Sequence, residues 1–158
     1  MYYTEWASPL GTLTLVASAA GLRGIYFAEH RHPPDRRGWQ RDGQHPVLQE
    51  AIRQLDAYFR GQLRQFDLPL DRSGGTAFQR RVWQALSEIP YGQTWSYQQL
   101  ARHLGQEKAV RAVGAANGRN PLSIVIPCHR VIAASGALTG YAGGLDNKMY
   151  LLKLEAVR

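Results

Sequence analysis

The stretch IVIPCHRVI, residues 124–132, interrupts an apolar run with a proline, a thiol, an imidazole and a guanidinium. A β-branched run is typical of a buried strand, and Pro127 cannot donate a ladder hydrogen bond, so we expect the strand to end just before it. Cys128, the only cysteine of the chain, would then lie at a strand end or turn. His129 exchanges a proton near neutral pH, and the charge of Arg130 favours a thiolate. Cys128 is either a nucleophile or a small core hydrophobe, and this stretch alone leaves both open.

The length and composition of the chain limit its class. With 158 residues it can form one ordinary domain or two small ones that share an interface. It has no apolar stretch of membrane-spanning length and no signal region, and one cysteine forms no internal disulfide, so we expect a cytoplasmic protein away from membranes. The nearest approach to paired metal ligands, His30 and His32, lies beside prolines in a charged loop. We therefore expect no metal and no cofactor.

The net charge of +7 is concentrated in the second half of the chain. Residues 1–73 carry 9 basic and 8 acidic residues, a net charge of +1, whereas residues 74–158 carry 10 and 4, a net charge of +6. The basic half also contains Cys128. A concentrated positive field suits an anionic polymer such as nucleic acid, although basic surfaces also serve solubility.

The N-terminal part, which we take as a domain over residues 1–72, alternates β-rich runs with turns. Apolar residues at helical spacing predict a helix over 48–59, and alternation predicts a further strand over 66–70. The polar residues 29–46 predict a loop, to which we assign no function. An antiparallel meander is predicted from the runs at residues 2–6, 13–17 and 22–27. This unit has a visible core and no catalytic constellation.

A hinge at residues 71–75 introduces the second predicted domain, residues 73–158. Thr76 and Gln79 form a capping-box pair, which predicts that a helix begins there. The last helix of the chain is predicted near residues 148–157. It carries Glu155 and turns inward the side chains of Leu151, Leu152 and Leu154.

A helix-turn-helix is predicted from Ser96 onward. Ser96 caps the first helix, Gly105 supplies the turn, and a second helix runs from about 108 to 117. At ~100° per residue, one face of the second helix is mainly apolar and must pack. The opposite, outward face holds Lys108, Arg111, Ala112, Ala115 and Arg119.

This outward face differs from that of a helix that reads base sequence. Base recognition in the major groove needs Asn, Gln or Arg at several exposed positions, whereas here alanines stand between basic residues. Small residues let the helix backbone approach a groove, while Lys108 and Arg119 hold phosphates and Arg111 projects alone. We therefore expect DNA binding with little sequence preference. An alanine face that packs against another helix is the structural alternative.

Five motifs in order resemble the O6-alkylguanine-DNA alkyltransferase family, and the match spans residues 76–155. They are SYQQL at 96–100, RAVG at 111–114, NP at 120–121, PCHRVI at 127–132, and TGY at 139–141 with GG at 143–144. The resemblance implies an α+β fold with an N-terminal ribonuclease-H-like α/β domain and a C-terminal helical, winged-helix-like helix-turn-helix domain. It implies DNA repair by direct reversal, in which the alkyl group of O6-alkylguanine, and more weakly of O4-alkylthymine, passes irreversibly to the protein's own cysteine. The implied partner is double-stranded DNA that contains alkylated guanine or thymine, bound by a monomer.

The resemblance also implies roles for individual residues. Cys128 would accept the alkyl group, His129 would deprotonate it through a water, Glu155 would orient His129, and Asn120 would tie down the turn. The positions implied to contact DNA or the substrate base are Tyr97, Gln98, Arg111, Ala112, Ala115, Val131, Tyr141 and Ala142. An alkyl group on O6 lies within the duplex, so the base must be extruded. Tyr97 would assist that rotation and Arg111 would fill the gap in the stack.

The chain departs from the family pattern at two positions. Leu154 stands where members often have a histidine, and Ala142 stands where some have serine, which affects the tolerance of bulky alkyl groups.

Two rival functions remain. A cysteine hydrolase would use Cys128 and His129 with Asn120 or Glu155, but the helix-turn-helix argues against it. A non-enzymatic lesion-binding relative would lack the nucleophile, and Cys128 argues against that.

Overall fold

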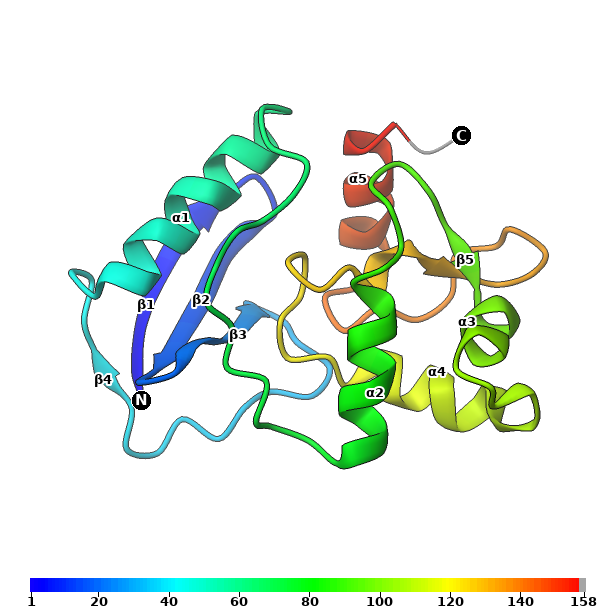
Figure 1. Ribbon diagram of the computed structural model, residues 1–158. Helices are drawn as coiled ribbons and strands as arrows, with labels where there is room; N and C mark the ends of the chain where they lie inside the picture. Colours follow the sequence, from blue (N-terminus) through cyan, green and yellow to red (C-terminus); the bar gives the residue numbers. More distant parts are fainter. Residues whose placement is uncertain (157–158) are drawn as a thin grey trace.

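The computed structural model describes residues 1–156, and its first half is a four-stranded sheet covered by one helix (Figure 1). The strand order is β3-β2-β1-β4. Strands β1, β2 and β3 pair antiparallel in sequence order, which confirms the predicted meander. The strands span Tyr2–Ser8 in β1, Gly11–Ser18 in β2, Gly21–Phe27 in β3 and Gln40–Arg41 in β4.

Helix α1, Pro46–Phe59, packs across the three meander strands (Figure 1). A proline suits the first turn because its missing N–H would have no partner there. The preceding His45 accepts a hydrogen bond from the Val47 backbone N–H at 3.2 Å and so caps the helix. Leu13, Leu15 and Ala17 alternate along β2 and are fully buried, as a period-two strand requires.

Two predictions for this half are wrong in detail. Residues 66–70 form no strand, and only an isolated bridge joins Leu70 to Leu22 of β3. Pro69 accepts a hydrogen bond from the Leu22 N–H at 2.8 Å but has no N–H to donate, so the ladder does not extend. The predicted loop 29–46 contains the two-residue strand β4, which pairs parallel to β1.

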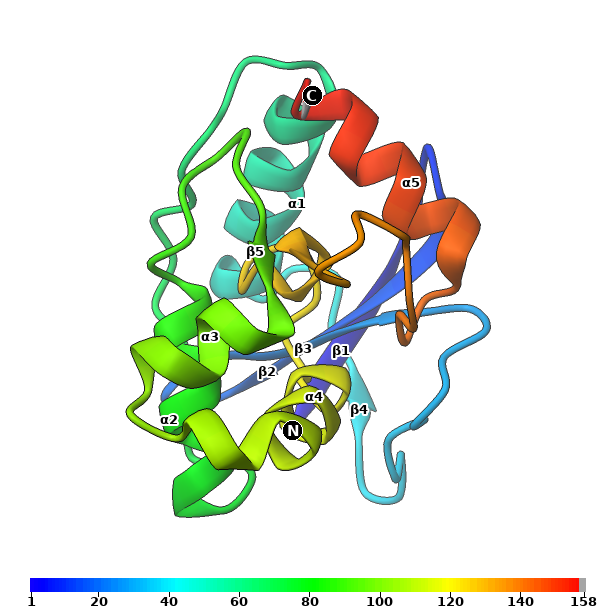
Figure 2. The same ribbon diagram turned by 90° about the vertical axis from the view of Figure 1, so that its right-hand side faces the viewer.

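The second half is mainly helical (Figure 2). The predicted capping box of Thr76 with Gln79 is confirmed, and Ser96 caps its helix as predicted, in a capping box with Gln99 that was not predicted. The predicted last helix ends earlier than expected, and residue 157 lies outside the described residues. The elements are α2 (Ala77–Leu86), β5 (Trp95–Ser96), α3 (Tyr97–His103), the 3₁₀ turn η1 (Glu107–Ala109), α4 (Val110–Gly118), the 3₁₀ turn η2 (Cys128–Arg130), β6 (Val131–Ile132) and α5 (Leu145–Leu154).

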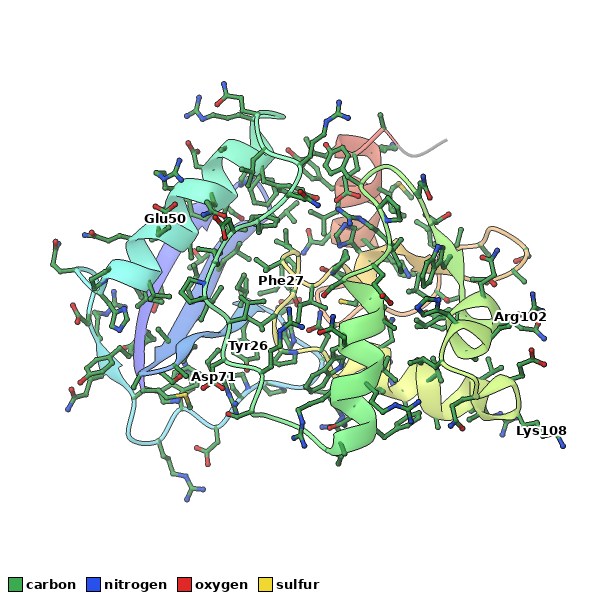
Figure 3. The ribbon with its side chains drawn as sticks, in the orientation of Figure 1. Tyr26, Phe27, Glu50, Asp71, Arg102 and Lys108 are labelled. Atoms are coloured by element: carbon green, nitrogen blue, oxygen red, sulfur yellow. The ribbon has the colours of Figure 1, made fainter. Side chains whose placement is uncertain are left out.

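The two halves share one continuous apolar core. The Ile25 N–H of β3 donates to the Pro121 carbonyl at 2.9 Å, so the sheet is joined directly to the segment that follows α4. Phe27, which Figure 3 places between the halves, meets Tyr141 edge-on with ring centroids 5.6 Å apart. The domain boundary near residue 72 stays a prediction. Within residues 1–156, no helix is both long and apolar enough to cross a membrane.

Candidate active site

The segment before the cysteine is a series of turns, so the predicted strand ending at Ile126 is wrong. Asn120 supplies the hydrogen bonds that a neighbouring strand would otherwise provide. Its Nδ2 donates to the Ile126 carbonyl at 2.8 Å, and its Oδ1 accepts from the Leu122 N–H at 3.0 Å. Ile124 adopts a φ of 74°, which is rare for a β-branched residue. The buried side chain of Asn120 thus overrides the local β-branched pattern. Asn120 is the residue that was expected to tie down this turn.

Cys128 begins the 3₁₀ turn η2 and is only 3% exposed. Burial raises the pKa of its thiol, while the Asn120 side chain and the positive charge of Lys148 act in the opposite direction. The net effect is a raised pKa, so the resting group is the thiol and a base is needed to form the thiolate. Arg130 was expected to favour the thiolate. It instead faces Glu155, and that expectation is wrong.

His129 and Glu155 form the expected pair. The His129 Nε2 lies 2.8 Å from Glu155 Oε2, and both side chains are fully buried. Arg130 completes the arrangement, because its Nε donates to Glu155 Oε1 at 2.8 Å and its terminal nitrogen donates to Oε2 at 3.0 Å. Tyr58, from α1 in the other half of the molecule, donates its hydroxyl to Oε2 at 2.5 Å. We call these four residues, Tyr58, His129, Arg130 and Glu155, the carboxylate cluster.

The electrostatics of the cluster fix the proton on one nitrogen of His129. Burial would raise the pKa of Glu155, but hydrogen bonds from His129 and Arg130 hold it at about 2, so the carboxylate is ionised. Burial lowers the pKa of His129 despite the neighbouring charge of Glu155, so the ring is neutral near pH 7. A neutral ring that faces a carboxylate through Nε2 carries its hydrogen there. Its Nδ1 has no hydrogen-bond partner among the described residues and is left as the basic atom.

Lys148 is the principal site residue that sequence reasoning missed. Its Nζ is fully buried and donates to the carbonyls of Val131 at 2.6 Å and Thr139 at 2.8 Å. Burial lowers its pKa to about 8. The ammonium therefore joins β6 to the loop over 139–144 and places a positive charge near the thiol. The signal was present in the sequence, because residues 148, 151, 152 and 155 share one face of a helix.

The residues expected to line the substrate pocket lie close to this turn. Val131 is fully buried, and Tyr141 and Ala142 are each 8% exposed. The backbone of Ala142 accepts a hydrogen bond from the Arg31 N–H at 2.9 Å, so the 29–46 segment contacts the loop directly. Tyr141 and Ala142 also line an open groove, together with Phe27 and Arg36.

The outer face of α4 is exposed as predicted. Trp83 of α2 holds the inner side by donating its indole N–H to the Ala116 carbonyl at 2.8 Å, and Val113 is fully buried. Figure 3 shows Lys108, at the start of this segment, pointing away from the body of the molecule. The alternative in which the alanine face packs against another helix is excluded, because all of the outward residues are exposed: Lys108, Arg111, Ala112, Ala115 and Arg119.

Two further expected contact residues come from α3. Tyr97 is half-buried, its ring lies against Gly114 of α4, and its hydroxyl accepts a hydrogen bond from Thr139 at 3.1 Å. Tyr97 thus lies between the two helices and the loop that follows the cysteine. Gln98 is exposed beside it. Within residues 1–156, no group of three or more His, Cys, Asp or Glu side chains could hold a metal ion.

The fold and the site together define a class of protein, in which a helix-turn-helix half carries a buried cysteine next to a histidine–glutamate pair. Comparison with protein families identifies the class more closely. The family model for the ribonuclease-like domain of 6-O-methylguanine DNA methyltransferase matches residues 1–72, and the model for its DNA binding domain matches residues 77–157. The chain belongs to the 6-O-methylguanine DNA methyltransferase family, and the resemblance seen in the motifs and the expected fold class are confirmed.

Similar proteins match over nearly the whole chain. A methylated-DNA–protein-cysteine methyltransferase of Methanosarcina acetivorans is 49% identical and covers 98% of both chains. One from Mycolicibacterium paratuberculosis is 51% identical and covers 97% of this chain and 91% of its own. Among solved structures, Mycobacterium tuberculosis OGT in complex with DNA superposes with a TM-score of 0.93 at 47% identity, covering 99% of this chain and 93% of that chain.

Proposed function

We propose that this protein repairs DNA by transferring the alkyl group of O6-alkylguanine, and more weakly of O4-alkylthymine, to Cys128, once per molecule. The observation that carries the proposal is the position of Cys128. It is a single buried thiol beside the His129–Glu155 pair, in the segment that follows the helix-turn-helix in the chain. The names of the similar proteins support the same activity.

The proposed reaction uses the free nitrogen of His129. Its Nδ1 takes the proton of the Cys128 thiol through a water, and Glu155 stabilises the imidazolium that forms. The thiolate attacks the alkyl carbon, so an S–C bond forms as the C–O6 bond breaks. The electron pair of that bond passes to the guanine, which takes up a proton. The product is a thioether, which has no easy hydrolytic exit, so the protein is consumed.

Duplex DNA is the proposed partner, and the exposed face of α4 is the proposed contact surface. Alanines 112 and 115 let the backbone approach a groove, while the basic residues around them contact phosphates without reading bases. Binding with little sequence preference and strong salt dependence follows. The DNA complex of the Mycobacterium tuberculosis protein supports DNA as the partner. We propose further that the protein acts as a monomer in the cytoplasm.

The extruded base would lie between Tyr97 and the loop that follows the cysteine. We propose that Tyr97 and Gln98 contact the strand that carries the lesion and that Arg111 enters the stack in place of the base. The pocket would be lined by Val131, Tyr141 and Ala142.

Intact-mass spectrometry after incubation with an O6-methylguanine duplex tests the proposal. We expect the protein to gain the mass of one methylene, and peptide mapping to place the methyl group on Cys128. An unmodified duplex is the control. A protein of unchanged mass that releases methanol repeatedly would instead indicate a hydrolase.

A further inference from the structure

Tyr58 is the one member of the carboxylate cluster that comes from the N-terminal half. It lies near the end of α1, is fully buried, and reaches a carboxylate 97 residues away in the sequence. Its ring packs against Phe66 and Tyr91, with centroids 5.4 and 6.4 Å away. A phenylalanine would fill that space equally well. The hydroxyl therefore needs a separate explanation, and its partner is Glu155.

The hydroxyl shares one oxygen with the histidine. Glu155 Oε2 accepts hydrogen bonds from Tyr58 at 2.5 Å, His129 at 2.8 Å and Arg130 at 3.0 Å, whereas Oε1 accepts only from Arg130 at 2.8 Å. Burial first, and then the charge of Glu155, raise the pKa of Tyr58. The phenol is therefore protonated near neutral pH and acts as a donor to Glu155.

We propose that Tyr58 is a positioning residue for alkyl transfer: its hydroxyl fixes Glu155 Oε2 and limits how strongly that oxygen attracts the proton of His129. The inference rests on the proposed function of Cys128 and His129. The proposal also gives the N-terminal half a part in the chemistry, since α1 supplies the Tyr58 hydroxyl as a hydrogen-bond donor to Glu155.

This arrangement predicts in which direction the pKa of His129 changes when the hydroxyl is removed. A carboxylate that loses one donor becomes more basic and stabilises the imidazolium more strongly. Without the Tyr58 hydroxyl, the pKa of His129 should rise. His129 would then be protonated, and unavailable as a base, at a higher pH than in wild type. The other titratable or charged groups around the pair are unchanged by such a substitution: Cys128, Arg130, Tyr141 and Lys148.

The test is the pH dependence of the transfer rate in Tyr58→Phe, measured with free O6-benzylguanine so that DNA binding is not involved. We expect the acidic limb of the profile to move up by about half a pH unit relative to wild type. Tyr91→Phe is the matched control, because it removes a half-buried hydroxyl that donates to the Leu154 carbonyl at 3.4 Å and does not touch Glu155. The control profile should coincide with that of wild type.

A second variant tests the same idea in the opposite direction. Replacing Tyr58 by 3,5-difluorotyrosine keeps the shape of the ring and makes the hydroxyl a stronger donor, so the acidic limb should move down. This variant also decides the matter should Tyr58→Phe fold poorly. If the acidic limb of the pH–rate profile stays at its wild-type position in the folded variants, the inference is overturned. Wild-type protein that transfers no alkyl group, neither from free O6-benzylguanine nor from an O6-methylguanine duplex, would instead overturn the proposed function.

Discussion

The carboxylate cluster and the outer face of α4 are both rich in charge, but they handle it in opposite ways. In the cluster, Glu155 is 2% exposed, and its two oxygens accept four hydrogen bonds from three side chains. On α4, Arg111 is exposed, and no hydrogen bond or ion pair to another described residue fixes its side chain. Removing one member of the cluster therefore leaves buried partners unsatisfied, whereas removing a side chain from the α4 face leaves none.

This contrast between buried and exposed charge distinguishes the chemistry and stability of the buried region from the DNA interaction of the exposed face. Changes in the buried region should alter chemistry and stability together, because the same contacts serve both. Changes on the exposed face should alter the interaction with DNA and leave stability almost untouched. The predictions below test this separation, beginning with the largest effect.

Cys128→Ser should abolish alkyl transfer and leave DNA binding intact. Serine nearly matches the size of cysteine, but its hydroxyl is far less acidic than a thiol and is a much weaker nucleophile toward an alkyl carbon. Intact mass should remain unchanged after incubation with the lesion, while fluorescence anisotropy with a labelled duplex should give the wild-type dissociation constant. Retained transfer would show that the acceptor has been misassigned.

Glu155→Gln should be the most destabilising single substitution in the cluster. Leaving the buried Arg130 without its carboxylate should lower the free energy of unfolding by about 3 kcal/mol. Glu88→Gln, which breaks the exposed contact with His103, should lower it by less than about 1 kcal/mol. Urea unfolding at pH 7 measures both, and equal losses would refute the separation.

The same carboxylate predicts a pH dependence of stability. Its folded-state pKa of about 2 lies below the unfolded value of 4.5, so the unfolded chain takes up the proton first as the pH falls. The stabilisation is complete above pH 4.5 and should disappear as the pH falls toward 2. The difference in unfolding free energy between wild type and Glu155→Gln should shrink over that window. A difference that is constant with pH would contradict the ionised state of Glu155.

Arg111→Ala should separate duplex repair from the chemistry. We expect about a tenfold loss of rate on duplex O6-methylguanine, because only the duplex needs a side chain to fill the vacated stack. The rate with free O6-benzylguanine and the melting temperature should stay at wild-type values. Lys153→Ala on α5, which removes an equal charge outside α4, is the control. Equal losses on duplex and free base would count against the stacking role.

Methylation of Cys128 should lower the stability of the protein by a moderate amount. An extra methyl group in a closely packed turn costs ~1 to 3 kcal/mol, which lowers the melting temperature by a few degrees in a chain of this size. Benzylation should lower it further. Melting curves of free and methylated protein at matched pH and salt measure the change. A methylated form that melts at or above the temperature of the free form would show that the pocket accepts the product without strain.

The sequence predicted most of the elements that depend on local chemistry. The capping box at Thr76, the helix cap at Ser96 and the outward face of α4 follow from neighbouring residues within a turn or two. The His129–Glu155 pair came from the family resemblance, since nothing local joins residues 26 apart.

The features that sequence analysis missed depend on the contacts of individual side chains. Residues 124–126 carry a strand-like pattern, yet the side chain of Asn120 holds this segment in turns. Tyr58 lies within the helix predicted over 48–59, and only the packing of the two halves shows that its hydroxyl reaches Glu155. Lys148 was overlooked because a lysine on a helix is usually solvated, although its spacing from Leu151 and Leu152 placed it on the buried face.

Counting the lesions that each protein molecule repairs tests the central claim most directly. Protein should be mixed with increasing excess of O6-methylguanine duplex, with repaired guanine and modified protein measured at completion. Repair should stop at one lesion per molecule, and every repaired lesion should match one methyl group on Cys128. Continued repair beyond one lesion per molecule, with Cys128 found unmodified, would contradict it.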